Sequence, residues 1–235
     1  MKQVALITGA NKGLGLEIAR QLGKLGHIVV LGARELAKGE AAAAGLRLAS
    51  IDAHAVAIDV TDDAQVAQLP EFFQSKFGRL DILVNNAGVA HWTTDSAATF
   101  RSTFDANVFG AVAVTYALLP LLKAAPAGRI VNHSSVLGSL TTMERDAAMY
   151  GDFIVPAYTA SKAALNGFTL ALATRIKGTS LKINAAHPGW VKTDLGGSAA
   201  PMLVEEGAKT AVRLATLPAD GPNGEFFHLE ERLPW

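Results

Sequence analysis

The glycine-rich segment from Thr8 to Gly15, which reads TGANKGLG, constrains the fold of this chain more than any other feature. It follows a short apolar run, Val4 to Thr8, and precedes a stretch of helical periodicity from Leu16 to Leu25. Glycines let a backbone turn tightly and approach a phosphate, and the N-terminus of the helix that follows offers free N–H groups. The spacing is G-x-x-x-G-x-G and not the usual G-x-G-x-x-G. Its position between strand and helix still favours a phosphate-binding loop over a plain glycine turn.

The rest of the chain repeats the same alternation of apolar runs and longer helical segments, which is typical of βαβ units around a buried parallel sheet. Strands are predicted at 4–8, 28–32, 53–58, 82–84, 129–132, 181–185 and 225–229. We therefore expect an α/β fold, a single doubly wound Rossmann-type domain over residues 1–235 with about seven mostly parallel strands and helices on both faces. Two stretches without clear periodicity, an insertion-like one at 141–156 and another at 195–202, are expected to be loops over the carboxyl edge of the sheet.

The composition limits the kinds of partner and site. Half of the 235 residues are hydrophobic and 18% are charged, which is enough apolar material for a large core. Basic and acidic side chains balance at 21 each, so a small-molecule partner is favoured over nucleic acid or a membrane. The absence of cysteine excludes disulfides, thiolate metal sites and cysteine nucleophiles. The apolar run 4–7 is too short for a signal-peptide core or a membrane span, so we expect a soluble, cytoplasmic protein.

The end of the second predicted strand bears on which nucleotide the chain would bind. An NAD-specific site is expected to carry an acidic residue there for the ribose 2′-hydroxyl, but this chain has Ala33 followed by Arg34. The planar guanidinium of Arg34 can pair with a 2′-phosphate, and Lys12 of the glycine loop can add a second positive charge. The alternative is that Arg34 is a solvated charge opening the next helix. The pattern favours NADP(H) over NAD(H).

Further motifs follow in a fixed order along the chain. They are Asp59-Val60, Asn85-Asn86-Ala87-Gly88, Asn107-Val108-Phe109-Gly110, Val131-Asn132-His133-Ser134-Ser135, Tyr158-Thr159-Ala160-Ser161-Lys162 and His187-Pro188-Gly189-Trp190-Val191-Lys192-Thr193. A single Y-x-x-x-K occurs by chance in many helices, but the ordered set does not. With it, the chain resembles the short-chain dehydrogenases/reductases over nearly its whole length, and among them most closely the NADPH-dependent carbonyl reductases.

The resemblance implies roles for particular residues. The catalytic residues would be Asn107, Ser135, Tyr158 and Lys162. The residues that bind NADP(H) would be Gly9, Asn11, Lys12, Gly13, Leu14, Gly15, Arg34, Asp59, Val60, Asn86, Ala87, Gly88, Tyr158, Lys162, Pro188, Gly189, Val191 and Thr193. Lys162 would hold the nicotinamide ribose, and Asn107 would anchor a water that reconnects Lys162 to solvent.

The spacing of Tyr158 and Lys162 suits acid/base chemistry. On a helix, positions i and i+4 share one face, so a fixed cation would lie near the phenol. Free tyrosine has a pKa near 10, and working near neutrality needs a lowering of about three units, roughly 4 kcal/mol. The lysine and an oxidised nicotinamide could supply much of it. Ser135 would hydrogen-bond the substrate oxygen while Tyr158 gives the proton.

Other residues and functions stay open. Trp92, Phe153, Trp190 and Met202 are candidates for an apolar substrate site, although core packing explains them about as well. No second ligand stands at metal spacing from His133 or His187, so no metal is expected and both are interpreted as structural.

The alternatives to a reductase of a ketone, aldehyde or quinone are a non-catalytic NADP(H)-binding sensor or scaffold and a 3-ketoacyl reductase. The interval from Ser135 to Tyr158 is longer than in compact family members, and an insertion there could block pairing of subunits or form a substrate lid. A homo-oligomer and a monomer therefore both stay open.

Overall fold

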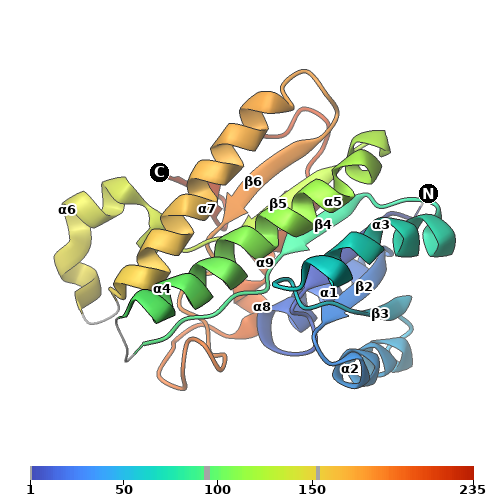
Figure 1. The fold of residues 1–235 in the computed structure, drawn as a ribbon, viewed down its shortest axis with the longest axis horizontal. Coiled ribbons are helices and arrows are strands. Elements are labelled where there is room, and N and C mark those ends of the chain that lie inside the picture. Colours follow the sequence, from blue (N-terminus) through green and yellow to red (C-terminus); the bar gives the residue numbers. More distant parts are fainter. Residues whose placement is uncertain (1, 93–95, 152–153) are drawn as a thin grey trace.

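The computed structural model describes residues 2–92, 96–151 and 154–235. Within them, eight strands form one sheet (Figure 1). Its order is β3-β2-β1-β4-β5-β6-β7-β8, and every neighbouring pair is parallel except β7 and β8. The strands are β1 Val4–Thr8, β2 Ile28–Ala33, β3 Ala53–Ala57, β4 Ile82–Asn85, β5 Arg129–His133, β6 Lys182–Ala186, β7 Phe226–His228 and β8 Glu231–Leu233. The order reverses at β1, between β2 and β4, so a crevice opens where the connections from β1 and β4 diverge.

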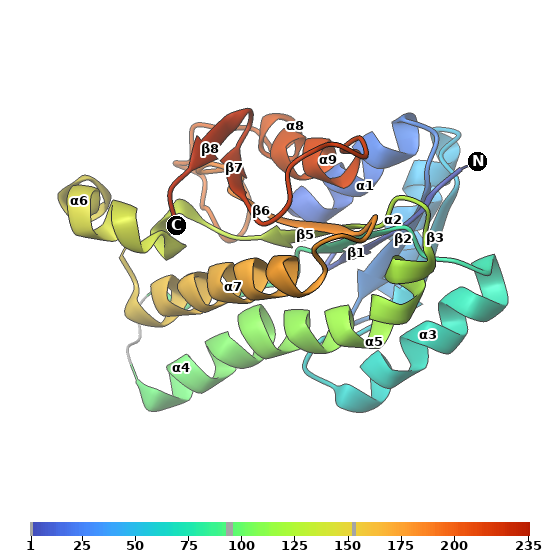
Figure 2. The same ribbon diagram turned by 90° about the horizontal axis from the view of Figure 1, so that it is seen from above.

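Helices cover both faces of this sheet, as the turned view shows (Figures 1 and 2). One layer contains α1 Gly13–Lys24, α2 Leu36–Leu48, α8 Val204–Gly207 and α9 Lys209–Ala215, and the other contains α3 Asp63–Phe77, α4 Ala97–Phe104, α5 Gly110–Ala124 and α7 Pro156–Arg175. A π-helical turn, η1 Asp105–Phe109, joins α4 to α5, and a 3-10 turn, η2 Val136–Gly138, follows β5. The helix α6 Leu140–Tyr150 lies apart from both layers.

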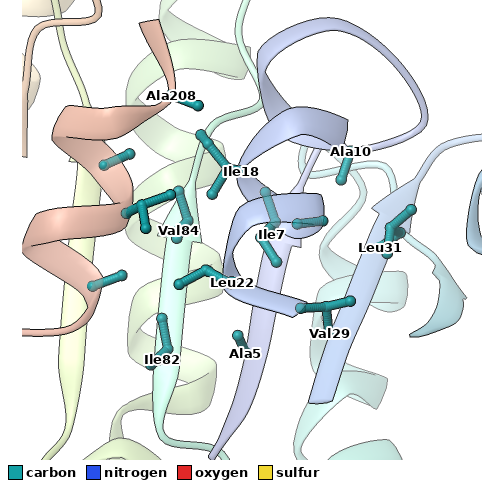
Figure 3. Close-up of a cluster of buried hydrophobic side chains, with 14 of the residues drawn as sticks. Ala5, Ile7, Ala10, Ile18, Leu22, Val29, Leu31, Ile82, Val84 and Ala208 are labelled. Atoms are coloured by element: carbon teal, nitrogen blue, oxygen red, sulfur yellow. The ribbon is translucent and has the colours of Figure 1, made fainter. Parts of the chain in front are cut away.

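The two larger apolar clusters of the core lie one on each face of the sheet. On one face, Ile18 and Leu22 of α1 pack over Ile7 of β1 and Val84 of β4 (Figure 3). On the other face, α3, α5 and α7 cover the opposite side chains of the same strands. Because both faces are buried, β1 and β4 contain the unbroken apolar runs 4–7 and 82–84 rather than an alternating pattern. This explains why their positions could be predicted from the sequence.

The predicted α/β architecture is confirmed, with two differences. An eighth strand, β8, was missed because it is short and carries Glu231 and Arg232, both exposed. The prediction of a loop at 141–156 was wrong, because most of that segment forms α6. Its periodicity is weak since Thr142 is its one buried residue within the described part of the helix, and a kink at Asp146 interrupts it. The prediction of a loop at 195–202 is confirmed.

The helical stretch Ala97–Ala124 is long and apolar enough to cross a membrane by length and composition. Its side chains Val114, Leu118 and Leu122 are fully buried against the sheet. Packing in the core of the domain accounts for these side chains, whereas Phe100, Phe109 and Tyr116 of the same stretch are exposed.

Candidate active site

The glycine loop joins β1 to α1 at the crevice. Gly9 and Gly13 have φ angles of +64° and +56°, in the left-handed region that favours glycine. The helix α1 begins at Gly13, with no side-chain cap from Lys12 and no acidic residue in its first turn. Its first N–H groups are therefore open to an anion, which supports the expected phosphate-binding role of Gly9, Asn11, Gly13 and Leu14.

Gly15 is a glycine for a different reason. A Cβ atom there would lie 2.6 Å from Nδ2 of Asn86 and 2.6 Å from the carbonyl oxygen of Gly9. The Asn86 amide fills this space and donates to the carbonyl oxygens of Thr8, at 2.9 Å, and Gly9, at 3.2 Å. The hydroxyl oxygen of Thr8 in turn accepts from the backbone N–H groups of Asn86 and Ala87. The glycine loop and the segment after β4 are thus bonded into one unit.

The residues expected to bind the adenosine half of the dinucleotide follow the ends of β2 and β3. Arg34 is exposed, and its side chain makes no ion pair or hydrogen bond with the residues that the structure describes. Asp59 accepts two hydrogen bonds from Thr61, and Val60 is buried against Gly110. Lys12 forms an ion pair with Asp194. A free cation is therefore available at Arg34, whereas Lys12 is already paired.

Ser135, Tyr158 and Lys162 come together although they belong to different elements. Ser135 follows β5, and Tyr158 and Lys162 lie on α7, whose first residue is Pro156. All three are at least nine-tenths buried, and Tyr158 and Ser135 line the same cavity. Lys162 Nζ lies 5.6 Å from the centre of the Tyr158 ring and donates to the carbonyl oxygen of His133 at 2.8 Å. The sequence spacing thus places a phenol, a hydroxyl and an ammonium within one small volume.

Burial sets the electrostatics of this group. Desolvation raises the pKa of Tyr158 to about 12, and the neighbouring Ser135 hydroxyl offsets only part of that rise. Desolvation also lowers the pKa of Lys162 to about 8. The expected lowering of the tyrosine pKa by the lysine is not present in the protein alone, because the cost of burying a phenolate dominates. Tyr158 is therefore protonated at neutral pH.

Asn107 lies in the π-helical turn η1 and is fully buried. Its Oδ1 accepts from the backbone N–H of Val89 at 2.8 Å, and its Nδ2 donates to the carbonyl oxygen of Val89 and to the hydroxyl of Ser161. A Cβ on Gly88 would lie 3.0 Å from Asn107 Oδ1 and 3.6 Å from Lys162 Nζ. The side chain of Asn107 is thus occupied in fixing the loop after β4 beside Lys162.

A cavity of about 590 Å³ opens in front of Tyr158 and Ser135. Its walls are mostly apolar. Its lining includes Leu14, Trp92, Leu137, Met149, Tyr150, His187, Pro188, Gly189, Trp190, Val191, Thr193 and Leu195. Of the expected substrate residues, Trp92 and Trp190 line the cavity, and Phe153 lies outside the described residues.

The segment after β6 forms one wall of this cavity. Gly189, with a φ angle of +88°, packs on Met202, whose Sδ would be 2.8 Å from a Cβ there. Met202 therefore supports the turn from behind and is absent from the described lining. Val191 pairs with Met202 in an isolated bridge, and Thr193 lies against Gly13 of the glycine loop. The predicted nicotinamide segment thus meets the predicted phosphate loop.

The sequence interpretation missed Met149 and Tyr150. Both come from α6, in the segment expected to be a loop, and they line the cavity together with the segment after β6. Their helical spacing was obscured because α6 buries so little of its surface. His187 was also missed as a lining residue; its Nδ1 accepts from the backbone N–H of Val136 at 3.3 Å.

Comparison with known proteins agrees with this geometry. Residues 3–204 match the family model described as short chain dehydrogenase. Short-chain dehydrogenase/reductase 1 of Saponaria officinalis is 35% identical, covering 100% of this chain and 96% of that protein. Carbonyl reductase (NADPH) 1 of Bos taurus is 34% identical, covering 99% of this chain and 98% of that protein.

Solved structures give the same result. The NADPH-bound carbonyl reductase from chicken fatty liver superposes with a TM-score of 0.86 at 28% identity, covering 100% of this chain and 99% of that one. Salutaridine reductase from Papaver somniferum superposes with a TM-score of 0.85 at 30% identity, covering 96% of this chain and 99% of that one.

Proposed function

Because the chain belongs to the short-chain dehydrogenase family, we propose that it is an NADPH-dependent oxidoreductase that reversibly reduces a ketone, aldehyde or quinone to the alcohol, with Tyr158 as acid/base. The observation that carries the proposal is the buried pair of Tyr158 and Ser135, which line one mostly apolar cavity, with the Lys162 ammonium 5.6 Å from the centre of the phenol ring. This combination provides a proton donor, an oxyanion partner and a cation in one water-poor site.

The residues of the crevice fit NADPH in their donor chemistry. The uncapped start of α1 and the glycine loop suit a pyrophosphate, and the unpaired guanidinium of Arg34 suits a 2′-phosphate. Asp59 and Val60 would flank the adenine, and Lys162 would hold the nicotinamide ribose. Pro188, Gly189, Val191 and Thr193, which lie between the cavity and the glycine loop, would hold the nicotinamide. The NADPH named for the bovine and chicken relatives supports this choice.

When bound, the dihydronicotinamide supplies the hydride that reduces the carbonyl carbon. Ser135 would donate a hydrogen bond to the carbonyl oxygen and stabilise its growing negative charge. Tyr158, which burial keeps protonated, would transfer its proton to the same oxygen. The tyrosinate left behind would be stabilised by the Lys162 ammonium and then reprotonated from solvent.

The cavity favours an apolar carbonyl compound of moderate size. Its volume of about 590 Å³ lies within the range of small-molecule sites, and two tryptophans and Met149 line it. Among the described lining residues, Asp194 is the only one with a carboxylate, and none is a lysine or an arginine. A substrate attached to a large acidic carrier would need a basic surface near the mouth, so a 3-ketoacyl reductase is the weaker alternative.

The test is the loss of NADPH absorbance when purified protein is mixed with a panel of aldehydes, ketones and quinones. NADH and the variant Tyr158→Phe serve as controls. Turnover with NADPH that the variant lacks is the expected result. Tight NADPH binding without turnover of any panel member would instead favour the sensor or scaffold function.

A further inference from the structure

The buried imidazole of His133 connects motifs that lie far apart in the sequence. His133 ends β5 and is 6% exposed. Its Nδ1 lies 3.0 Å from Oδ1 of Asn86, in the segment after β4. Its backbone carbonyl accepts the hydrogen bond from Lys162 of α7. His133 therefore contacts both Asn86, which is bonded to the glycine loop, and Lys162, a proposed catalytic residue.

The hydrogen-bond network assigns the proton on this imidazole. Asn86 uses its Nδ2 to donate to the carbonyl oxygens of Thr8 and Gly9, so its Oδ1 must be the acceptor facing His133. Nδ1 of His133 is therefore the protonated nitrogen. Nε2 is left as a bare acceptor, and it is buried with no partner among the described residues. A buried acceptor without a donor is destabilising, so this imidazole is not explained by packing alone.

The Asn86 amide is in turn part of the glycine loop. It occupies the space that a side chain at Gly15 would fill, and it bonds to the two carbonyl oxygens that begin the loop. If the amide lost the donor on its Oδ1, it would be left with an unsatisfied buried acceptor. It would then be held by its bonds to the loop carbonyls alone, so its position, and that of the loop, would be less firmly fixed.

We infer that His133 is a positioning residue for the dinucleotide: its Nδ1–H fixes the Asn86 amide, and the amide fixes the glycine loop in its phosphate-binding shape. This inference rests on the proposed function, since it assumes that the loop binds NADPH. The imidazole does not act on the substrate. The hydrogen bond from Lys162 goes to the backbone carbonyl of His133 and survives a change of side chain.

The expected consequence is that a change at His133 affects the binding of the cofactor and not the chemical step. A loop that has relaxed must be reordered when the dinucleotide binds, so the cost falls on cofactor affinity. Once the cofactor is bound, Tyr158, Ser135 and Lys162 are in place as before. Loss of the Nδ1–H donor should therefore raise the Kd and KM for NADPH and leave kcat nearly unchanged.

The experiment compares two variants of nearly equal shape. His133→Asn places an amide N–H₂ close to the position of Nδ1, whereas His133→Leu has no donor. Calorimetric titration with NADPH measures Kd directly, and kcat is measured with saturating NADPH. We expect His133→Leu to raise Kd by about tenfold, from one lost hydrogen bond and one unsatisfied acceptor. His133→Asn should restore Kd to within about twofold of the wild type.

Two results would overturn the inference: wild-type affinity in His133→Leu, or equal weakening in both variants. If His133→Leu does not fold, Asn86→Asp provides the second test, because it keeps the shape of the amide but cannot donate to Thr8 and Gly9. Wild-type NADPH affinity in Asn86→Asp would also contradict the inference. A wild-type protein that binds no NADPH would instead refute the proposed function, so the two failures are distinguishable.

Discussion

The ammonium of Lys162 lies 5.6 Å from the centre of the Tyr158 ring, and its hydrogen bond goes to a backbone carbonyl rather than to the phenol oxygen. Lys162 is thus a neighbouring charge and not a proton partner of Tyr158 in the protein alone. Because burial raises the pKa of Tyr158 to about 12, the phenol is ready to donate a proton. A protonated phenol suits the proposed reduction, in which an acid is needed.

Replacing Tyr158 by phenylalanine should remove the proposed acid with little change in packing. We expect kcat for carbonyl reduction to fall by roughly 10²- to 10⁴-fold, the usual contribution of a general acid. NADPH affinity should change by less than about threefold, since the variant removes one expected cofactor contact and leaves the glycine loop untouched. Steady-state rates and calorimetric titration measure the two quantities. A variant that keeps near-normal kcat would show that another group supplies the proton.

Lys162 should make stability rise with pH in the mildly alkaline range. Its folded pKa is lowered from 10.5 to about 8, so between these values the unfolded chain holds a proton that the folded chain does not. The free energy of unfolding should therefore increase by about 2 kcal/mol from pH 8 to pH 10. Urea unfolding of the wild type and of Lys162→Met measures this difference, and the variant should lack the rise. Parallel pH curves would mean that Lys162 is not titrating in this range.

Much of the fold could be predicted because its strands are buried on both faces. Ile7 and Val84 end the unbroken apolar runs 4–7 and 82–84, so their signal does not depend on how neighbouring elements pack. The strand β8 and the helix α6 gave no such signal. Both are largely exposed, and their structure depends on tertiary contacts such as the hydrogen bond from the backbone N–H of Thr141 to the carbonyl oxygen of Trp235.

The residues of the candidate site likewise include some that local sequence predicts and some that it does not. Tyr158 and Lys162 have a fixed helical spacing, and the glycine loop has a fixed place after β1, so local sequence was enough to find them. His133 was interpreted as structural because nothing local distinguishes it; its role depends on Asn86, 47 positions away. Interactions of that sequence separation are created by the folded sheet and leave no pattern in the sequence.

His133 should make the protein sensitive to mild acid. Burial lowers its folded pKa to about 3, so below its ordinary pKa of 6.5 the unfolded chain binds a proton and the folded chain does not. Stability is then fully present above pH 6.5 and is lost as the pH falls. Between pH 6.5 and 4.5 the wild type should lose about 2 kcal/mol more than His133→Asn in urea unfolding. Equal losses in the two proteins would show that His133 is already charged or solvated.

Arg34 should decide between the two dinucleotides. The exposed guanidinium has no partner among the described residues, so it is available to a 2′-phosphate. Arg34→Asp should lower the ratio of kcat/KM for NADPH to that for NADH by roughly 10- to 100-fold, because it removes one charge-assisted contact and adds a repulsive charge. Arg34→Gln is the matched control and should give a smaller shift. An unchanged ratio would place the 2′-phosphate elsewhere.

Asp194 should compete with the cofactor for Lys12. Lys12 forms an ion pair with Asp194, and the pairing lowers the pKa of that carboxyl. Asp194→Asn keeps the shape and frees the ammonium, so NADPH should bind roughly two- to fivefold more tightly at low salt, the range expected for an exposed ion pair. The gain should shrink at high salt and should be smaller for NADH, if Lys12 meets the 2′-phosphate.

The control for this prediction is Lys12→Met made in both backgrounds. If Asp194 acts through Lys12, then Asp194→Asn should no longer tighten NADPH binding once the lysine is gone. A gain of the same size without Lys12 would show that Asp194 simply repels the phosphates through space. A loss of affinity in Asp194→Asn would show instead that the ion pair holds the segment after β6 over the bound dinucleotide, and the dissociation rate of NADPH would then increase.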